Sequence, residues 1–140
     1  MEANRAHPIL LYDGVCGLCN RLVQFVLKRD AGAHFRFASL QSNFASRILQ
    51  RHGLDPHDLD TLYVVEEPGE RLTARSDAVI SLLRQLGGPW GAVAVLLRAL
   101  PRRLRDWGYG VVARNRYRLF GKYESCLLPQ EKYQHRFLDV

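Results

Sequence analysis

The sequence predicts an α/β fold with a four-stranded mixed sheet, flanking helices and a C-terminal helical extension. One observation is that short apolar runs of strand length alternate with longer stretches of helical periodicity. A second is the turn at Pro68-Gly69, which joins two strand-like runs as an antiparallel hairpin. The length of 140 residues suits one hydrophobic core, so we expect a single domain (1–140), with a core at 9–88 and a helical extension and tail at 89–140.

Each element is predicted from its periodicity and its flanking residues. The expected strands are 9–12, 35–38, 62–65 and 71–74, and the expected helices are 16–29, 42–52, 77–86, 89–100 and 103–119. Ser42 and Ser76 are suited to cap the second and third helices, because a serine hydroxyl can accept a free N–H of the first turn. The expected core positions of helix 89–100 are Trp90, Val93, Leu96, Leu97 and Leu100.

The order of these elements narrows the fold further. Two parallel strands joined by a helix, followed by an antiparallel hairpin and a covering helix, form the thioredoxin-fold pattern. In that pattern strand 9–12 is central, with 35–38 on one side and 62–65 on the other. The first helix then starts at the carboxyl end of the central strand, where open α/β sheets place their sites.

Cys16 and Cys19 lie at this point, with two residues between them. A cysteine at a helix N-terminus has a lowered thiol pKa, because free N–H groups and the helix dipole stabilise the thiolate. The helical period puts Cys19 on the same apolar face as Leu22, Val23 and Val26, so we expect Cys19 to point inward and Cys16 to be exposed. We therefore expect Cys16 to be the attacking thiolate and Cys19 the resolving thiol of a redox pair that needs no cofactor.

A metal or iron–sulfur site is the main alternative for this cysteine pair, and two inert thiols are another. A structural zinc site usually has four ligands, so Cys126 and His135 would have to converge on the pair. The context of a Cys-x-x-Cys sequence next to a strand–helix pattern favours the redox function. Cys126 itself has three interpretations, namely an accessory thiol that receives the disulfide, a metal ligand, or a buried hydrophobe, of which we favour the last.

Four further residues are candidates for the site. Asp13 could begin a turn and accept backbone N–H groups, which we favour, or relay a proton to Cys19. In the thioredoxin pattern the turn into the third helix flanks the dithiol, and glutaredoxins use it to hold glutathione. There Arg75 could bind a carboxylate, Ser76 could supply hydrogen bonds and Asp77 could pair with an ammonium group. An ordinary helix start, with a serine cap and an acid in the first turn, explains the same residues, and we slightly favour it.

The net charge of +6 is concentrated near the C-terminus. The basic residues there are Arg98, Arg102, Arg103, Arg105, Arg114, Arg116, Arg118 and Lys122. We favour a solvated helical face over a surface for an acidic partner, nucleic acid or an anionic membrane, because no nucleic-acid motif accompanies the charge. The N-terminus has no apolar secretory segment and no apolar run reaches the length of a membrane span, so we expect a cytoplasmic protein.

The stretch from Leu11 to Asn20 resembles the signature of the DCC-type family of thiol-disulfide oxidoreductases, which are thioredoxin-like. Further segments resemble that family at 35–41, 76–79, 100–106 and 113–121, and Cys126 resembles a cysteine often found in its tail. The resemblance implies protein-disulfide reductase activity on a protein or small-molecule disulfide. Electrons would come from glutathione or a reductase.

The chain departs from thioredoxin and glutaredoxin proper at one place. Those proteins carry a cis-proline just before the third strand, where this chain has Asp60-Thr61. The proline clamps an extended substrate and keeps metal ions away from the dithiol. Its absence weakens the case for a general protein-disulfide reductase and keeps the metal alternative open.

Overall fold

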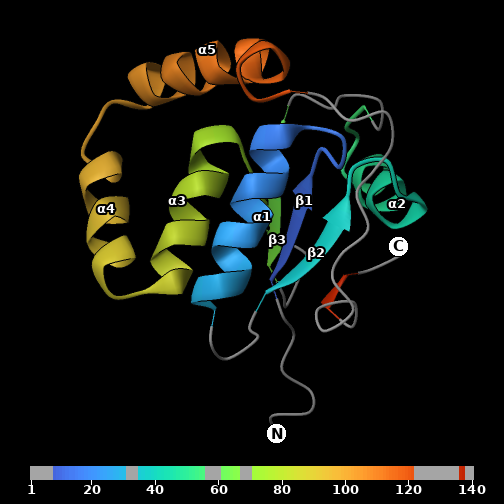
Figure 1. Ribbon diagram of the computed structural model, residues 1–140, viewed down its shortest axis with the longest axis horizontal. Helices are drawn as coiled ribbons and strands as arrows, with labels where there is room; N and C mark the ends of the chain where they lie inside the picture. Colours follow the sequence, from blue (N-terminus) through green and yellow to red (C-terminus); the bar gives the residue numbers. More distant parts are fainter. Residues whose placement is uncertain (1–7, 31–34, 56–60, 67–70, 122–135, 138–140) are drawn as a thin grey trace, which may run out of the picture.

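The computed structural model describes residues 8–30, 35–55, 61–66, 71–121 and 136–137 (Figure 1). In chain order its elements are β1 (Ile9–Tyr12), α1 (Gly17–Arg29), β2 (Arg36–Ser39), α2 (Asn43–Arg51), β3 (Tyr63–Glu66), β4 (Arg71–Ala74), α3 (Arg75–Leu86), α4 (Pro89–Arg98) and α5 (Arg102–Phe120). Every expected strand and helix is therefore present, with ends that differ by at most two residues from those expected.

The four strands form one mixed sheet in the order β2-β1-β3-β4. Strand β1 is parallel to β2 and antiparallel to β3, and β3 is antiparallel to β4. Leu10 of the central strand lies opposite Phe37 on one side and Val64 on the other. The thioredoxin-like topology and the central position of β1 are confirmed. The expected hairpin turn at 67–70 lies outside the described residues.

The period-2 alternation of the strands divides the apolar residues between two cores. Leu10 and Val64 belong to the core under α1 and α3, together with Val26 and Leu82. Leu11 faces the opposite side, where Ala38, Ile48, Leu49, Tyr63 and Val65 form the core under α2. Figure 1 shows α1 and α3 side by side on one face of the sheet. Both faces of β1 are thus covered, which is why its sequence is apolar at every position from Ile9 to Tyr12.

The two expected serine caps have different outcomes. Ser42 caps α2, because its Oγ accepts the N–H of Ala45 at 3.2 Å. The prediction for Ser76 is wrong, since α3 begins at Arg75 and no side chain caps it. The Ser76 hydroxyl instead donates to the carboxylate of Asp106 on α5, so a tertiary partner replaces the local one.

Helices α4 and α5 continue beyond this sheet-and-helix unit. Helix α4 packs beside α3, and α5 crosses the ends of α1 and α3 (Figure 1). The expected burial of Leu96 and Leu100 is wrong, because these side chains are 70% and 41% exposed. Helix α4 is apolar around most of its circumference, and α3 covers one side of it only. None of the described helices combines the length and the apolar character that crossing a bilayer requires.

Candidate dithiol active site

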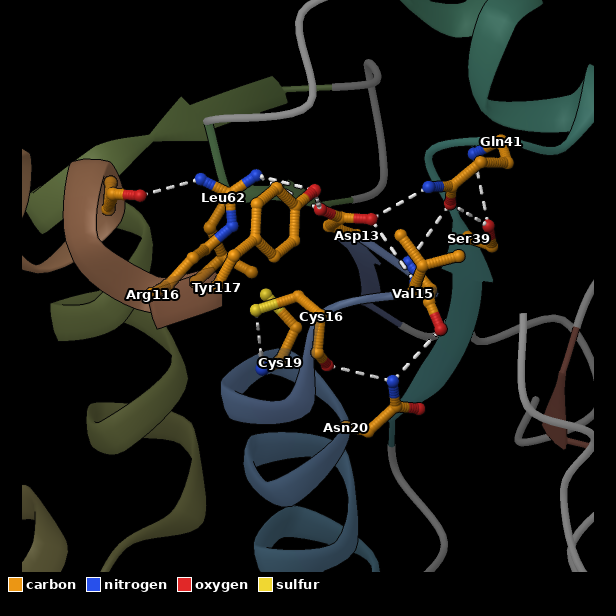
Figure 2. Close-up of polar contacts among 12 residues, drawn as sticks. Asp13, Val15, Cys16, Cys19, Asn20, Ser39, Gln41, Leu62, Arg116 and Tyr117 are labelled. Atoms are coloured by element: carbon orange, nitrogen blue, oxygen red, sulfur yellow. Dashed lines mark hydrogen bonds and ion pairs between the residues drawn. The ribbon is translucent and has the colours of Figure 1, made fainter. Parts of the chain in front are cut away.

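Cys16 is the N-cap residue of α1, with extended backbone angles just before the first turn. Its Sγ accepts the backbone N–H of Cys19 at 3.5 Å, and the two sulfurs lie beside each other (Figure 2). Both cysteines are free thiols. The sulfur of Cys16 therefore occupies the position in which an N-cap side chain satisfies the unpaired N–H groups of the helix.

The environment separates the pKa values of the two thiols. A hydrogen bond from the Cys19 thiol lowers the pKa of Cys16 to about 6 against the effect of burial, and the N–H groups of Cys19 and Leu18 and the charge of Arg116 add to this shift. The same hydrogen bond, together with burial, raises the pKa of Cys19 above its ordinary value. At neutral pH the pair therefore consists of a Cys16 thiolate and a Cys19 thiol.

The expected exposure of Cys16 is wrong. Its side chain is completely buried, whereas Cys19 packs against the core and is only partly buried. The end of α5 lies against the start of α1, where the N–H of Gly17 donates to the carbonyl of Gly121 at 3.0 Å. The helical period predicts which way Cys19 faces, but it contains no information about a distant segment that covers the N-terminus of the helix.

Asp13 is buried at the end of β1 and accepts four hydrogen bonds (Figure 2). Its Oδ2 accepts Nη2 of Arg116 at 2.9 Å and the hydroxyl of Tyr117, both from α5. Its Oδ1 accepts Nε2 of Gln41 at 2.7 Å and the N–H of Val15 at 3.2 Å. A single carboxylate thus joins the strand that precedes the dithiol, the loop after β2 and the C-terminal helix.

The electrostatics of Asp13 favour a role in holding the turn before Cys16 over a role as a proton relay for Cys19. Burial raises the pKa of the carboxyl, but the hydrogen bonds from Tyr117, Gln41, Arg116 and Val15 together hold it below its ordinary value. A carboxylate that stays ionised beside an arginine is a weak proton acceptor at neutral pH. We therefore interpret Asp13 as a residue that positions the loop before Cys16 and anchors α5 to it.

Two amides hold the backbone of that loop. Gln41 accepts the N–H of Gly14 through its Oε1 at 2.9 Å, while its Nε2 donates to Asp13. Asn20 donates through Nδ2 to the carbonyls of Gly14 and Cys16, both at 2.9 Å. The loop between β1 and α1 is therefore bound from both sides, which fixes the position of the Cys16 sulfur.

Helix α5 also reaches the strand that faces the dithiol. The N–H of Leu62, next to Thr61, donates to the hydroxyl of Tyr109 at 2.7 Å. Burial raises the pKa of Tyr109 to about 12, so this hydroxyl stays protonated at neutral pH. At the edge where thioredoxin carries its cis-proline, this chain places a tyrosine of its own C-terminal helix.

The side chains of Arg75, Ser76 and Asp77 contact α5. The guanidinium of Arg75 lies over the ring of Tyr109 at 5.1 Å, and Arg75 is the one described non-glycine residue with a positive φ, 58°. The carboxylate of Asp77 pairs with Arg102 at 2.7 Å and with Arg105 at 3.0 Å. Ser76 donates to Asp106 of the same helix. Their use as a glutathione site remains a prediction, and α5 supplies their present partners.

A cavity of about 450 Å³ lies beneath α5, and Cys19 forms part of its wall. The cavity is mainly apolar, with side chains from α1, α3, α4 and α5. Residues that line it include Leu18, Leu22, Val79, Leu97, Leu104 and Val112. The cavity therefore borders the dithiol at Cys19, and Cys16 does not line it.

Four residues that contact the site through their side chains have no role in the sequence-based prediction. Arg116, Tyr117 and Gln41 all contact Asp13, and Tyr109 contacts the opposite strand. One signal was available, because Arg116 lies seven residues after Tyr109, which places both on the same side of a helix. An aspartate at the end of a fully apolar strand also requires a partner, but the sequence does not say which one.

Metal ligands are not clustered in the described part of the chain, where no group of three or more His, Cys, Asp or Glu side chains could hold an ion. Cys126 and His135 lie outside the described residues, so the predicted accessory thiol and the four-ligand site remain predictions.

Comparison with known proteins identifies the family. A family model described as DCC1-like thiol-disulfide oxidoreductase matches residues 10–122. The chain belongs to this DCC1-like family. It is 42% identical over 130 residues to the uncharacterized protein YuxK of Bacillus subtilis, covering 93% of each chain. It is 39% identical over 121 residues to a chloroplastic DCC family protein of Arabidopsis thaliana, covering 86% of this chain and 69% of that one. No solved structure matches it.

The resemblance in the sequence is therefore confirmed at the level of the family and the fold. The match of the DCC1-like model extends through residue 122 and so includes all of α5. This agrees with the geometry, in which that helix supplies the partners of Asp13, Leu62 and Asp77.

Proposed function

We propose that this DCC1-like protein exchanges electrons with disulfides through the Cys16–Cys19 pair. The observation that carries the proposal is the pair of adjacent free thiols at the start of α1, where the Cys16 sulfur accepts the N–H of Cys19. This arrangement lowers the pKa of Cys16 to about 6 and raises that of Cys19. A thiolate at neutral pH is the nucleophile that thiol–disulfide exchange requires, and the neighbouring thiol is held ready for the second step. The family description supports the same class of chemistry.

The reaction consists of two exchanges. The Cys16 thiolate attacks one sulfur of a substrate disulfide, forms a mixed disulfide and releases the first substrate thiolate. Cys19 then loses its proton and attacks the Cys16 sulfur, which forms the Cys16–Cys19 bond and releases the second substrate thiolate. Two electrons pass from the dithiol to the substrate. We propose glutathione or a reductase as the donor that returns them, with a protein or small-molecule disulfide as the substrate.

The burial of Cys16 constrains this mechanism. A disulfide sulfur must approach along the line of the bond that breaks, and the Cys16 side chain has no exposed surface. The end of α5 lies against the residue that follows it, with the Gly17 N–H bonded to Gly121. Attack on a protein disulfide therefore requires the last turn of α5 to move away from Cys16.

The lowered pKa predicts the pH dependence of alkylation. The rate at which iodoacetamide alkylates Cys16 should rise with pH, because only the thiolate reacts. It should reach half its maximum near pH 6 and level off at higher pH. Cys19 should stay largely unmodified over this range because its pKa is raised. Tandem mass spectrometry of the peptide with both cysteines distinguishes the two sites. In denaturant both should titrate near the ordinary thiol value, and a midpoint there in the folded protein would refute the pKa separation.

The function is tested by equilibrating the protein with defined ratios of reduced to oxidised glutathione and trapping its thiols. We expect a two-electron Cys16–Cys19 disulfide, a glutathione mixed disulfide on Cys16 in the Cys19→Ser variant, and neither product in Cys16→Ser. Metal content is measured on the same sample. Stoichiometric zinc or iron with thiols that do not exchange would replace this proposal with the metal or iron–sulfur module.

A further inference from the structure

The exposed large hydrophobic residues of this protein are confined to one region. Across the described ranges, all seven that are more than about two-fifths exposed fall within residues 95–119. They are Val95, Leu96, Leu100, Leu104, Trp107, Val112 and Leu119. Trp107 and Leu119 are each 66% exposed. Single exposed hydrophobic residues are common on proteins, but exposed hydrophobic residues that share one side of a helix are typical of a binding surface.

On α5 the exposed residues share one side of the helix, which we call the outer face. At 100° per residue its members fall within about half of the circumference. They are Arg103, Leu104, Trp107, Val112, Arg114, Arg118 and Leu119. Leu104 and Val112 belong to the part of this face that borders the cavity beneath α5, and they also form part of its wall. The opposite side of α5 carries Asp106, Tyr109, Gly110 and Arg116, which face the protein. Figure 1 shows α5 along the edge of the molecule. The bonds of its opposite side to Asp13, Leu62 and Ser76 leave Trp107 and the arginines of the outer face on the side away from these partners.

Five of the six arginines of α5 belong to two groups, and the sixth, Arg102, is exposed and pairs with Asp77. Arg105 and Arg116 face inward and pair with carboxylates of Asp77 and Asp13. Arg103, Arg114 and Arg118 are exposed among the hydrophobic residues of the outer face. Between residues 89 and 121 the only acid is Asp106, and its carboxylate accepts the Ser76 hydroxyl. The outer face therefore combines apolar side chains with charged side chains that are all basic.

We propose that the outer face of α5 is a peripheral binding surface for an anionic lipid bilayer. Leucine, valine and tryptophan side chains enter the boundary between headgroups and acyl chains, while arginine side chains reach the lipid phosphates. Tryptophan is particularly stable at that boundary. The helix lies on the bilayer, in agreement with the lack of a spanning segment among the described helices.

Charge and apolar area together favour a bilayer over other occupants. A second copy would bring three arginines of one outer face against three of the other without an acid between them. Nucleic acid would satisfy the arginines but offers little apolar surface for Leu104, Trp107 and Leu119. An anionic bilayer supplies a negative surface and an apolar interior to the same face.

The test is co-sedimentation of the full-length protein with vesicles of phosphatidylcholine alone or with about a third phosphatidylglycerol, at low and moderate salt. We expect binding to the anionic vesicles that weakens as salt rises, and a blue shift of tryptophan emission that is lost in Trp107→Phe. Neutralising Arg103, Arg114 and Arg118 with glutamine should reduce binding at least about tenfold. Leu104→Ser with Leu119→Ser should reduce it at unchanged net charge and unchanged thermal stability.

A matched control separates the position of the charges from their number. Glutamine at Arg47, Arg71 and Arg84, which are exposed on α2, β4 and α3, gives the same net charge as the outer-face triple variant. We expect it to bind vesicles nearly as well as wild type. Equal losses in both triple variants would reduce the interaction to net charge and overturn the proposal. No binding to anionic vesicles at low salt would overturn it too, as would concentration-dependent dimerisation abolished by Leu104→Ser or binding to nucleic acid alone.

Discussion

Replacing Arg116 with methionine is expected to lower the free energy of unfolding by about 3–5 kcal/mol, because it leaves the buried carboxylate of Asp13 without its cation. The Arg116 side chain is 5% exposed and that of Asp13 is 1% exposed, so water cannot replace the lost partner. Methionine keeps most of the side-chain volume and removes the charge. Urea unfolding followed by circular dichroism measures the effect, and the pKa of Cys16 should rise at the same time because Arg116 contributes to its low value.

Two controls test whether the loss comes from the pair. Arg118→Met, two residues later on the outer face, should change stability by no more than about 0.5 kcal/mol. The double variant Asp13→Asn with Arg116→Met should be more stable than Arg116→Met alone, because it no longer buries an unpaired charge. If the two single effects simply added in the double variant, the ion pair would not be the source of the loss.

In the wild-type protein, acid is expected to lower the stability through protonation of Asp13. The folded pKa of Asp13 lies below its ordinary value of 3.8, so its contribution is fully present above about pH 4 and is lost as the pH falls through the folded pKa. In Arg116→Met the cation that favours the ionised carboxylate is gone, and the loss of stability with acid should become smaller.

The second large effect is expected for Gly17→Ala, which should destabilise the fold by about 1–3 kcal/mol or more. A Cβ at Gly17 would lie 2.0 Å from the carbonyl oxygen of Phe120 and 2.9 Å from its carbonyl carbon. These are backbone atoms at the end of α5, so the clash cannot be relieved by rotating a side chain. The end of α5 must move, and the bond from the Gly17 N–H to Gly121 is lost.

Gly108→Ala is the matched control, because it adds the same methyl group to a helical glycine where the new Cβ would have no heavy atom within 4 Å beyond its chain neighbours and the nearby backbone of its own helix. Alanine should stabilise that position by up to about 1 kcal/mol. The two variants should also differ in chemistry. Moving the end of α5 in Gly17→Ala should accelerate modification of Cys16 by a bulky thiol reagent at pH 8, whereas Gly108→Ala should not. Similar stability and Cys16 reactivity in both variants would contradict the conclusion that the end of α5 covers Cys16.

The sheet was predictable from local sequence because each strand is short and flanked by clear breaks, and the central strands β1 and β3 are mainly apolar. Leu10 and Leu11 alternate between two cores, and Ser42 caps α2 through a partner only three residues away. The position of the dithiol at the start of α1 follows from the same kind of information. These features depend on periodicity and on near neighbours, which a sequence displays directly.

The covering of the dithiol was not predictable in this way. The burial of Cys16 and the pairing of Asp13 with Arg116 depend on where α5 crosses the molecule, and helical periodicity does not fix a crossing position. Ser76 was misassigned for the same reason, since its partner Asp106 lies 30 residues away. Leu96 is exposed because α3 covers only one side of α4, and the hydrophobicity of a residue does not show which side of its helix is covered.

The pairing of Asp13 with α5 also has a consequence for the order in which the protein is made. Arg116 and Tyr117 lie 103 and 104 residues after Asp13, so they leave the ribosome long after the dithiol loop. At a synthesis rate of about 5–20 residues per second, the nascent chain carries both cysteines for roughly 5–20 s before these partners exist. During that interval Asp13 has no cation with which to be buried, and the Cys16 thiolate lacks the charge of Arg116. The dithiol site is therefore complete only after the chain has been translated through its last helix.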